Sequence, residues 1–126
     1  MTVAPAFANL GFERVTKPPA AWGYPEVAAH IFARAPRLTA PTDRPIEVLE
    51  AGGGSASHMP LPSKARITTI DISPEQLARN TYAAETLLGD LQTFDYGTRT
   101  FDVVIAWDVM EHVPDPVAAL DRLVSI

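Results

Sequence analysis

The sequence IEVLEAGGGSA at residues 46–56 combines a strand pattern with a run of three glycines. Its aliphatic and β-branched residues predict a strand over 46–51, and the three glycines at 52–54 predict a turn directly after it. Glycines at the carboxyl end of a strand allow a ligand to approach the backbone closely. Glu50, two residues before the first glycine, would repel a phosphate there but attract an ammonium group. The stretch therefore predicts a strand with a ligand site at its carboxyl end.

Three further stretches predict strands. They lie at residues 67–72 (ITTIDI), near 86–88, and at 101–107 (FDVVIAW), and the last is wholly apolar after its aspartate. Such runs are typical of strands that are buried on both faces. Because strand patterns alternate with helix patterns, the sequence predicts an α/β fold with a parallel sheet and helices on both of its faces.

Two helices are predicted from their N-terminal patterns. Ser73, Pro74 and Gln76 form a capping-box pattern ahead of the helix residues Leu77, Ala78 and Tyr82. Asp115 caps a second helix that begins beside a proline. The residues expected to share one face of this helix are Val117, Leu120, Leu123 and Val124.

The first part of the chain differs from the rest in composition. Residues 1–45 hold seven of the twelve prolines and five basic against three acidic residues, whereas residues 46–126 hold five basic against twelve acidic ones. Residues 1–24 predict a Pro-rich arm, and residues 25–35 predict a short amphipathic helix. We therefore expect an N-terminal part at 1–45 and a ligand-binding domain at 46–126.

Length, charge and composition exclude several classes of protein. The chain has 126 residues, a net charge of −5 and no cysteine, which allows one domain and excludes disulfide frameworks and thiolate zinc sites. The acidic balance disfavours nucleic acid as a partner. No run reaches the roughly 18 apolar residues of a membrane span, and the N-terminus lacks a signal-peptide pattern. We expect a cytoplasmic protein without a membrane partner.

Two more carboxylates follow predicted strands. Asp71 comes 19 residues after Gly52, where a carboxylate can accept hydrogen bonds from both hydroxyls of a ribose. Asp90 follows Gly89 after the third strand, where it could accept from an exocyclic amine. Each also fits a simpler interpretation, a solvated strand end for Asp71 and an ordinary turn for Asp90.

Taken in order, these motifs resemble the class I S-adenosylmethionine-dependent methyltransferases, especially those that act on small molecules. The motifs are EAGGG at 50–54, DISPEQL at 71–77, GDL at 89–91 and FDVVIAWDVMEHVPDP at 101–116. The resemblance implies a Rossmann-like sheet with strand order 3-2-1-4, whose remaining three strands of seven are missing here. It also implies S-adenosylmethionine as the cofactor and methyl transfer to a small-molecule acceptor, which the sequence does not identify.

The resemblance further implies a role for each motif residue. Glu50 would bind the amino group of the methionine half of the cofactor, and the turn at 52–54 would lie against that half. Asp71 would bind the ribose hydroxyls, with Ile72 packed on the adenine and the Asp90–Leu91 pair at its edge. The expected cofactor-binding residues are Glu50, Gly52, Gly53, Gly54, Asp71, Ile72, Asp90, Leu91, Trp107 and Asp108, of which the last two would line the methionine and substrate side.

Catalysis of this kind depends mainly on positioning the acceptor and removing its proton. His112 is the candidate base, because imidazole exchanges a proton near neutral pH, although a structural role in which it bonds to backbone is an open alternative. His30 and His58 are expected to be structural or solvated. No group of residues has the spacing of a known metal motif, so no metal site is expected.

Two other functions are less well supported but remain open. The glycine turn also suits a nicotinamide-dependent reductase, although Ser57 replaces the third glycine of that fingerprint and Glu50 would lie near the pyrophosphate. The fourth strand would form a bare apolar edge. The chain could therefore be a truncated, non-catalytic binding or scaffold module that needs a partner segment, or it could self-associate through that edge. We expect a fragment or a truncated relative.

Overall fold

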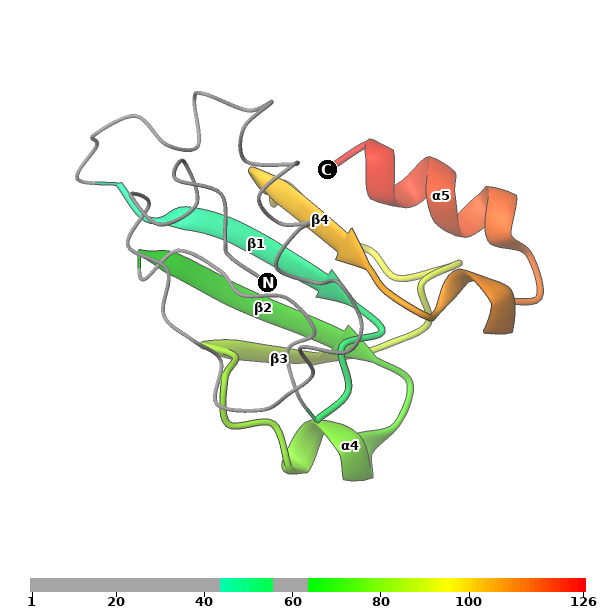
Figure 1. The fold of residues 1–126 in the computed structure, drawn as a ribbon. Coiled ribbons are helices and arrows are strands. Elements are labelled where there is room, and N and C mark those ends of the chain that lie inside the picture. Colours follow the sequence, from blue (N-terminus) through cyan, green and yellow to red (C-terminus); the bar gives the residue numbers. More distant parts are fainter. Residues whose placement is uncertain (1–43, 56–63) are drawn as a thin grey trace, which may run out of the picture. The chain divides into compact units, whose positions relative to one another are not determined.

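A computed structural model describes residues 44–55 and 64–126 of the chain. Their strands are β1 (Ile46–Ala51), β2 (Ala65–Asp71), β3 (Glu85–Leu88) and β4 (Val103–Ala106). These strands form one sheet in the order β3-β2-β1-β4, and the arrows in Figure 1 all run the same way. The predicted α/β class and strand order 3-2-1-4 are confirmed.

Several predictions concern residues outside the described ranges. The N-terminal arm and its amphipathic helix, predicted within 1–45, lie there, as does most of the connection between β1 and β2. His30 and His58 also fall outside the described residues. Apart from Ile46 and Ala65, the described strands belong to one compact unit. The same unit contains helix α4 (Pro74–Ala78), the short 3₁₀ helix η2 (Met110–His112) and helix α5 (Pro116–Val124).

Parallel pairing brings the carboxyl ends of the strands to one edge of the sheet. In the β1–β4 pair, Glu50 lies opposite Ile105, and in the β2–β3 pair, Asp71 lies opposite Leu88. The residues that follow each strand therefore leave the sheet at this edge, where ligands of open α/β sheets bind. We call it the carboxyl edge.

The bounds of β4 differ from the prediction because of Asp102. The predicted strand spans 101–107, but the observed one is limited to Val103–Ala106. Asp102 makes two hydrogen bonds with the backbone of Glu47. Its N–H donates to the Glu47 carbonyl, and its side-chain Oδ2 accepts from the Glu47 N–H at 2.9 Å. The carboxylate thus replaces a backbone acceptor at the start of the ladder.

Helix α4 spans only Pro74–Ala78 and does not reach Tyr82 as predicted. Ser73 caps it, because its Oγ accepts from the Gln76 N–H at 3.3 Å. The helix ends early because Asn80 folds the chain into a turn, with its Oδ1 accepting from the N–H groups of Tyr82 and Ala83 at 2.9 and 2.8 Å. Asparagine favours such local side-chain bonds over helix.

Helix α5 spans Pro116–Val124, close to the prediction. Asp115 is its N-cap, with Oδ1 accepting from the Ala118 N–H at 3.0 Å. Ala119 and Leu123 are its buried residues. The predicted face is therefore wrong in part, since three of its four members are exposed: Val117, Leu120 and Val124. The 3₁₀ helix η2 (Met110–His112) lies between β4 and α5.

The main hydrophobic core joins the sheet to α5 and to the segment after β3. Its buried members are Leu49, Ala51, Ile70, Leu91, Tyr96, Ala119 and Leu123. Tyr96 makes edge-to-face contacts with Phe94 and Phe101, at ring-centroid distances of 4.8 and 6.5 Å. None of the helices in residues 44–55 and 64–126 has the length and apolar content to span a bilayer.

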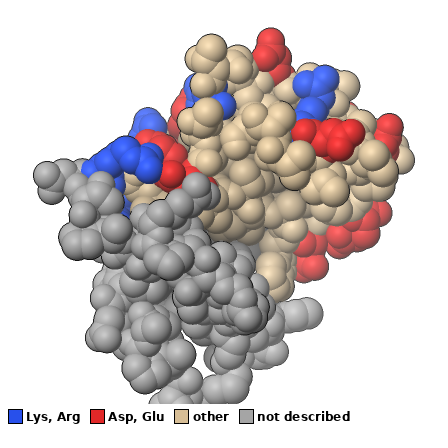
Figure 2. Space-filling model, turned by 90° about the horizontal axis from the view of Figure 1, so that it is seen from above, with Lys and Arg blue, Asp and Glu red and all other residues tan. Residues whose placement is uncertain are grey.

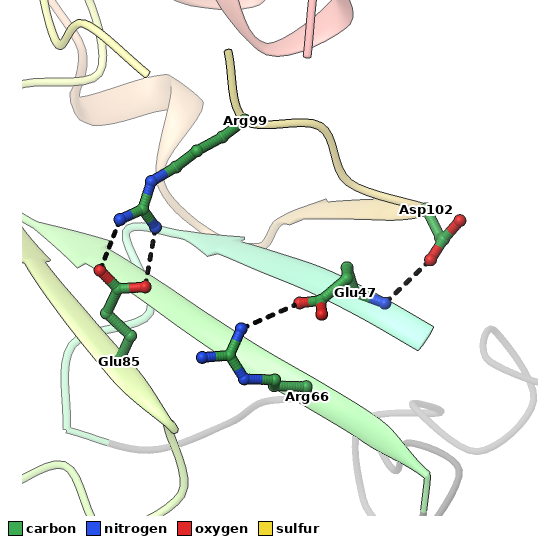
Figure 3. A network of polar contacts seen from close by, with 5 residues as sticks. All are labelled: Glu47, Arg66, Glu85, Arg99 and Asp102. Atoms are coloured by element: carbon green, nitrogen blue, oxygen red, sulfur yellow. Dashed lines mark hydrogen bonds and ion pairs between the residues drawn. The ribbon is translucent and has the colours of Figure 1, made fainter. Parts of the chain in front are cut away.

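A network of charged residues lies at the opposite edge, where the strands begin (Figure 3). Arg99 donates two hydrogen bonds to the Glu85 carboxylate, at 2.7 and 2.6 Å. Arg66 lies 3.6 Å from Glu47, whose N–H in turn binds Asp102. The hydrogen bonds from Arg99 lower the pKa of Glu85. These contacts join β1 to β2 and to the start of β4, and they join β3 to the segment before β4, at the edge remote from the glycine turn.

Candidate functional site at the carboxyl edge

The glycine turn has a backbone that only glycine adopts without strain at two of its three positions. Gly52 and Gly54 have φ angles of +69° and +58°. A Cβ on Gly52 would collide with the side chain of Val109, and one on Gly53 would lie 2.9 Å from Thr69 Cγ2. The turn is therefore packed tightly between the ends of β2 and β4.

Glu50 lies directly against this turn. Its side chain is only 2 % exposed, and its Oε2 lies 3.1 Å from where a Cβ of Gly53 would be. Burial of a carboxylate is costly unless a donor or cation faces it. The structure thus places a buried carboxyl group beside the turn.

Asp71 also faces the turn. Its Oδ1 accepts from the Ser73 N–H at 2.9 Å, and its Oδ2 lies 3.6 Å from the Cβ position of Gly54. Gln76 Oε1 lies 3.7 Å from the same position. The capping-box prediction is therefore half right, because Asp71 rather than Gln76 binds the Ser73 N–H, and the glutamine side chain is turned toward the glycine turn.

Asp90 follows β3 and is held by one neighbour. Its Oδ1 accepts from both the main-chain N–H and the side-chain Nε2 of Gln92, at 2.8 and 3.0 Å, and its Oδ2 accepts from Nε2 at 3.2 Å. These bonds lower the pKa of Asp90. The hydrogen bonds from Gln92 therefore favour the ionised form of this carboxylate.

Apolar side chains stand beside the two aspartates. Ile72 and Leu88, next to Asp71 in sequence and in sheet register, are 72 % and 58 % exposed. Leu91 differs, because its side chain is buried in the core. Any contact that Leu91 makes with a ligand would therefore come from its backbone.

The residues after β4 complete the carboxyl edge. Trp107 is half-buried, and Asp108 is exposed with a φ of +48°, the left-handed region that a non-glycine residue seldom adopts. His112 lies on η2 with its side chain 78 % exposed and its Nε2 3.7 Å from Glu111 Oε1. Among residues 44–55 and 64–126, no group of three or more potential metal ligands comes together.

Four residues that shape the site were not predicted from the sequence. They are Gln76, Asn80, Gln92 and Val109. Gln76, Asn80 and Val109 contact residues of the glycine turn that are distant in sequence, and such contacts cannot be predicted from a single sequence. The Asp90-x-Gln92 spacing is the only local hint, since an aspartate often binds the N–H two residues on.

Comparisons with known proteins agree with this geometry. The sequence model of a family described as a methyltransferase domain matches residues 24–126. A phosphatidylethanolamine N-methyltransferase of Cereibacter sphaeroides is 31 % identical over 130 residues, which cover 95 % of this chain and 55 % of that protein. The chain thus spans about half the length of this curated relative.

Two solved structures share the fold. One is the plantazolicin methyltransferase BpumL in complex with SAH, with a TM-score of 0.52 and 19 % identity over 64 % of this chain and 34 % of that one. The other is magnesium protoporphyrin IX methyltransferase from Synechocystis PCC 6803 with bound SAM, with a TM-score of 0.50 and 18 % identity over 89 % and 62 %. With the family match, the ordered strands and the glycine turn in place, the chain belongs to the methyltransferase domain family.

Proposed function

We propose that the carboxyl edge binds S-adenosylmethionine and that the protein transfers its methyl group to a small-molecule acceptor. The observation that carries the proposal is the meeting of Asp71, Gln76 and Gly54, which brings a carboxylate from the end of β2 against the glycine turn after β1. Support also comes from the two solved relatives, whose names record bound SAH and SAM.

The methionine half fits the region around Glu50. A buried carboxylate beside a turn without side chains suits a ligand that carries an ammonium group and lies close to the backbone. The turn carries no side chains at Gly52 and Gly53 because Val109 and Thr69 occupy the space where a Cβ would lie. Trp107 and Asp108 would line the same side.

The adenosine half fits the ends of β2 and β3. Asp71 Oδ2 would accept from the ribose hydroxyls, while its Oδ1 is held by the Ser73 N–H. The exposed side chain of Ile72 would pack on the adenine ring, and Asp90 with the Leu91 backbone would meet its edge. Burial of this apolar side chain by a planar ring would add to the affinity.

The bound cofactor would supply a methyl group already activated by a sulfonium. The protein's own part is to hold the acceptor in line and to accept its proton where it has one. We propose His112 as that base, because its exposed imidazole can pass the proton on to solvent. Replacement of His112 by alanine should then lower kcat and leave the Kd for S-adenosylhomocysteine unchanged.

The named relatives use different acceptors: phosphatidylethanolamine, plantazolicin and magnesium protoporphyrin IX. Because these molecules differ, we propose only that the acceptor of this chain is a small molecule. On the face drawn in Figure 2, the Lys and Arg side chains of the described residues lie beside Asp and Glu, which offers no continuous basic track for a phosphate backbone.

The test is calorimetric titration of the purified chain with S-adenosylhomocysteine, with Asp71→Asn as the variant. Asparagine keeps the acceptor for the Ser73 N–H but loses the charge and one acceptor, so we expect Kd to rise about 10- to 100-fold. Asp95→Asn is the matched control, because Asp95 accepts from the N–H two residues on, as Asp71 does, but outside the site. An unchanged Kd in Asp71→Asn, or binding of NADH in place of S-adenosylhomocysteine, would contradict the proposal.

Self-association through β4 stays a prediction. Among the described residues, β4 is an edge strand of the sheet, and such edges can pair with another chain. Light scattering at increasing concentration tests it, and a monodisperse monomer throughout would exclude it.

A further inference from the structure

We infer that Asn80 is a positioning residue for the cofactor site, because its side chain fixes the carbonyl group of Gly54 in the glycine turn. The inference rests on the proposed function, since it assigns Asn80 an effect on cofactor affinity. Asn80 itself lies beyond the motifs that the resemblance to methyltransferases covers residue by residue.

The carboxamide of Asn80 uses both of its ends. Its Nδ2 donates to the Gly54 carbonyl at 2.9 Å, across 26 residues of sequence. Its Oδ1 accepts from the N–H groups of Tyr82 and Ala83 at 2.9 and 2.8 Å. The side chain is half-buried at the end of α4. One amide group therefore connects the turn after β1 to the turn between α4 and β3.

This connection fixes the last residue of the glycine turn. Gly54 has a φ of +58° and no side chain of its own, and a glycine backbone has the greatest freedom to lose on ordering. Asn80 follows α4, whose Gln76 already lies near Gly54, and α4 itself follows Asp71. The bond thus holds the glycine turn in register with the aspartate expected to bind the ribose.

The orientation of the next N–H group follows from the same bond. A trans peptide is planar, so its C=O and the N–H of the next residue point in opposite directions. With the Gly54 carbonyl directed at Asn80, the Ser55 N–H must point away from Asn80. A donor whose direction is set before binding costs less to order when the ligand arrives.

The two ends of the carboxamide can be separated by an isosteric change. Asn80→Asp keeps an acceptor for the Tyr82 and Ala83 N–H groups but removes the donor to Gly54. It also places a carboxylate oxygen against the Gly54 carbonyl oxygen. If Asn80 only shapes its own turn, this variant binds cofactor as well as the unchanged protein. If it positions the glycine turn, affinity falls.

The experiment titrates S-adenosylhomocysteine into the unchanged chain, Asn80→Asp and the control Thr81→Asp. The control adds the same charge one residue away, on an exposed side chain, and leaves Asn80 intact. We expect Kd to rise about five- to tenfold in Asn80→Asp, as for loss of one hydrogen bond, and to stay unchanged in Thr81→Asp. In ¹⁵N–¹H spectra of the free proteins, the Ser55 amide should shift in Asn80→Asp and stay unchanged in Thr81→Asp.

Each other outcome overturns the inference. Equal Kd values for the unchanged chain and Asn80→Asp would overturn the inference about Asn80 and leave the proposed function intact. Absence of binding by the unchanged chain would overturn both. Should Asn80→Asp fail to fold, Asn80→Ser replaces it. A serine hydroxyl can still accept from the following N–H groups but is too short to reach Gly54, so the same loss of affinity is expected, and a wild-type Kd would again refute the inference.

Discussion

Gln92 donates its side-chain Nε2–H groups to both carboxylate oxygens of Asp90, at 3.0 and 3.2 Å. The same amide accepts from the Asp115 N–H through Oε1, at 2.9 Å. One side chain therefore joins the segment after β3 to the N-terminus of α5. The donors lower the pKa of Asp90, with the larger part of the effect coming from the Gln92 main-chain N–H.

The Gln92→Glu variant tests this control of Asp90. Glutamate keeps an acceptor for the Asp115 N–H but replaces the donors to Asp90 with a like charge, so the pKa of Asp90 should rise. The lowered pKa of the unchanged chain contributes stability above the ordinary pKa of aspartate, and this contribution is lost as pH falls through the folded value. NMR titration of the carboxyl carbons measures the change. An unaltered pKa in the variant would show that the main-chain donor alone is responsible.

Gly52→Ala should destabilise the fold by more than backbone strain alone. A positive φ costs an L residue about 1–2 kcal/mol, and the added Cβ would also collide with Val109, for which overpacking costs about 1–3 kcal/mol. Gly97→Ala separates the two effects, because Gly97 has a φ of +62° but nothing within 4 Å of its Cβ position. Urea denaturation of both variants gives the difference, and equal losses would disprove the collision.

Glu85→Gln should lower stability slightly and only above acidic pH. The Arg99–Glu85 pair is half-exposed, with side-chain exposures of 43 % and 32 %, so its contribution at neutral pH should stay below about 1 kcal/mol. Because the folded pKa of Glu85 is lowered, this contribution is present above the ordinary glutamate pKa of about 4.3 and vanishes as pH falls through the folded value. Denaturation of both proteins at pH 7 and near pH 3 checks it, and a difference that grows on acidification would contradict the assignment.

Leu123→Ala and Leu120→Ala should differ sharply although both leucines lie on α5. Leu123 is 5 % exposed and Leu120 is 53 % exposed. Truncation of a buried leucine costs about 2–5 kcal/mol, whereas the exposed one should cost well under about 1 kcal/mol. Thermal unfolding followed by circular dichroism compares them. Similar losses would mean that the exposed face of α5 is covered in solution.

The sequence predicted those parts of the fold that depend on local pattern. The apolar run before the glycines specified β1, and the Asp115–Pro116 pair specified the start of α5. The length of α4 was not predictable from local pattern. Asn80 ends the helix by forming a turn, and the hydrogen bond that holds its side chain there goes to Gly54, which lies 26 residues away in the sequence.

The sequence predicted which carboxylates lie at the candidate site, but it did not predict the contacts that orient them. Glu50 and Asp71 both face the glycine turn as expected. The role of Gln76 depends on competition for one donor, because Asp71 accepts the Ser73 N–H that the capping-box pattern assigns to Gln76. Such competition is decided by three-dimensional distances, which spacing along the chain does not encode.

The charge network of Figure 3 has a practical consequence for engineering this domain. Its five residues lie where the strands begin, whereas all the candidate ligand contacts lie where the strands end. Thermal tolerance can therefore be tuned by redesigning Glu47, Arg66, Glu85, Arg99 and Asp102 as a set. The candidate ligand site at the other end of the same strands can then be varied separately, because substitutions at distant sites that share no partners usually have additive effects on stability.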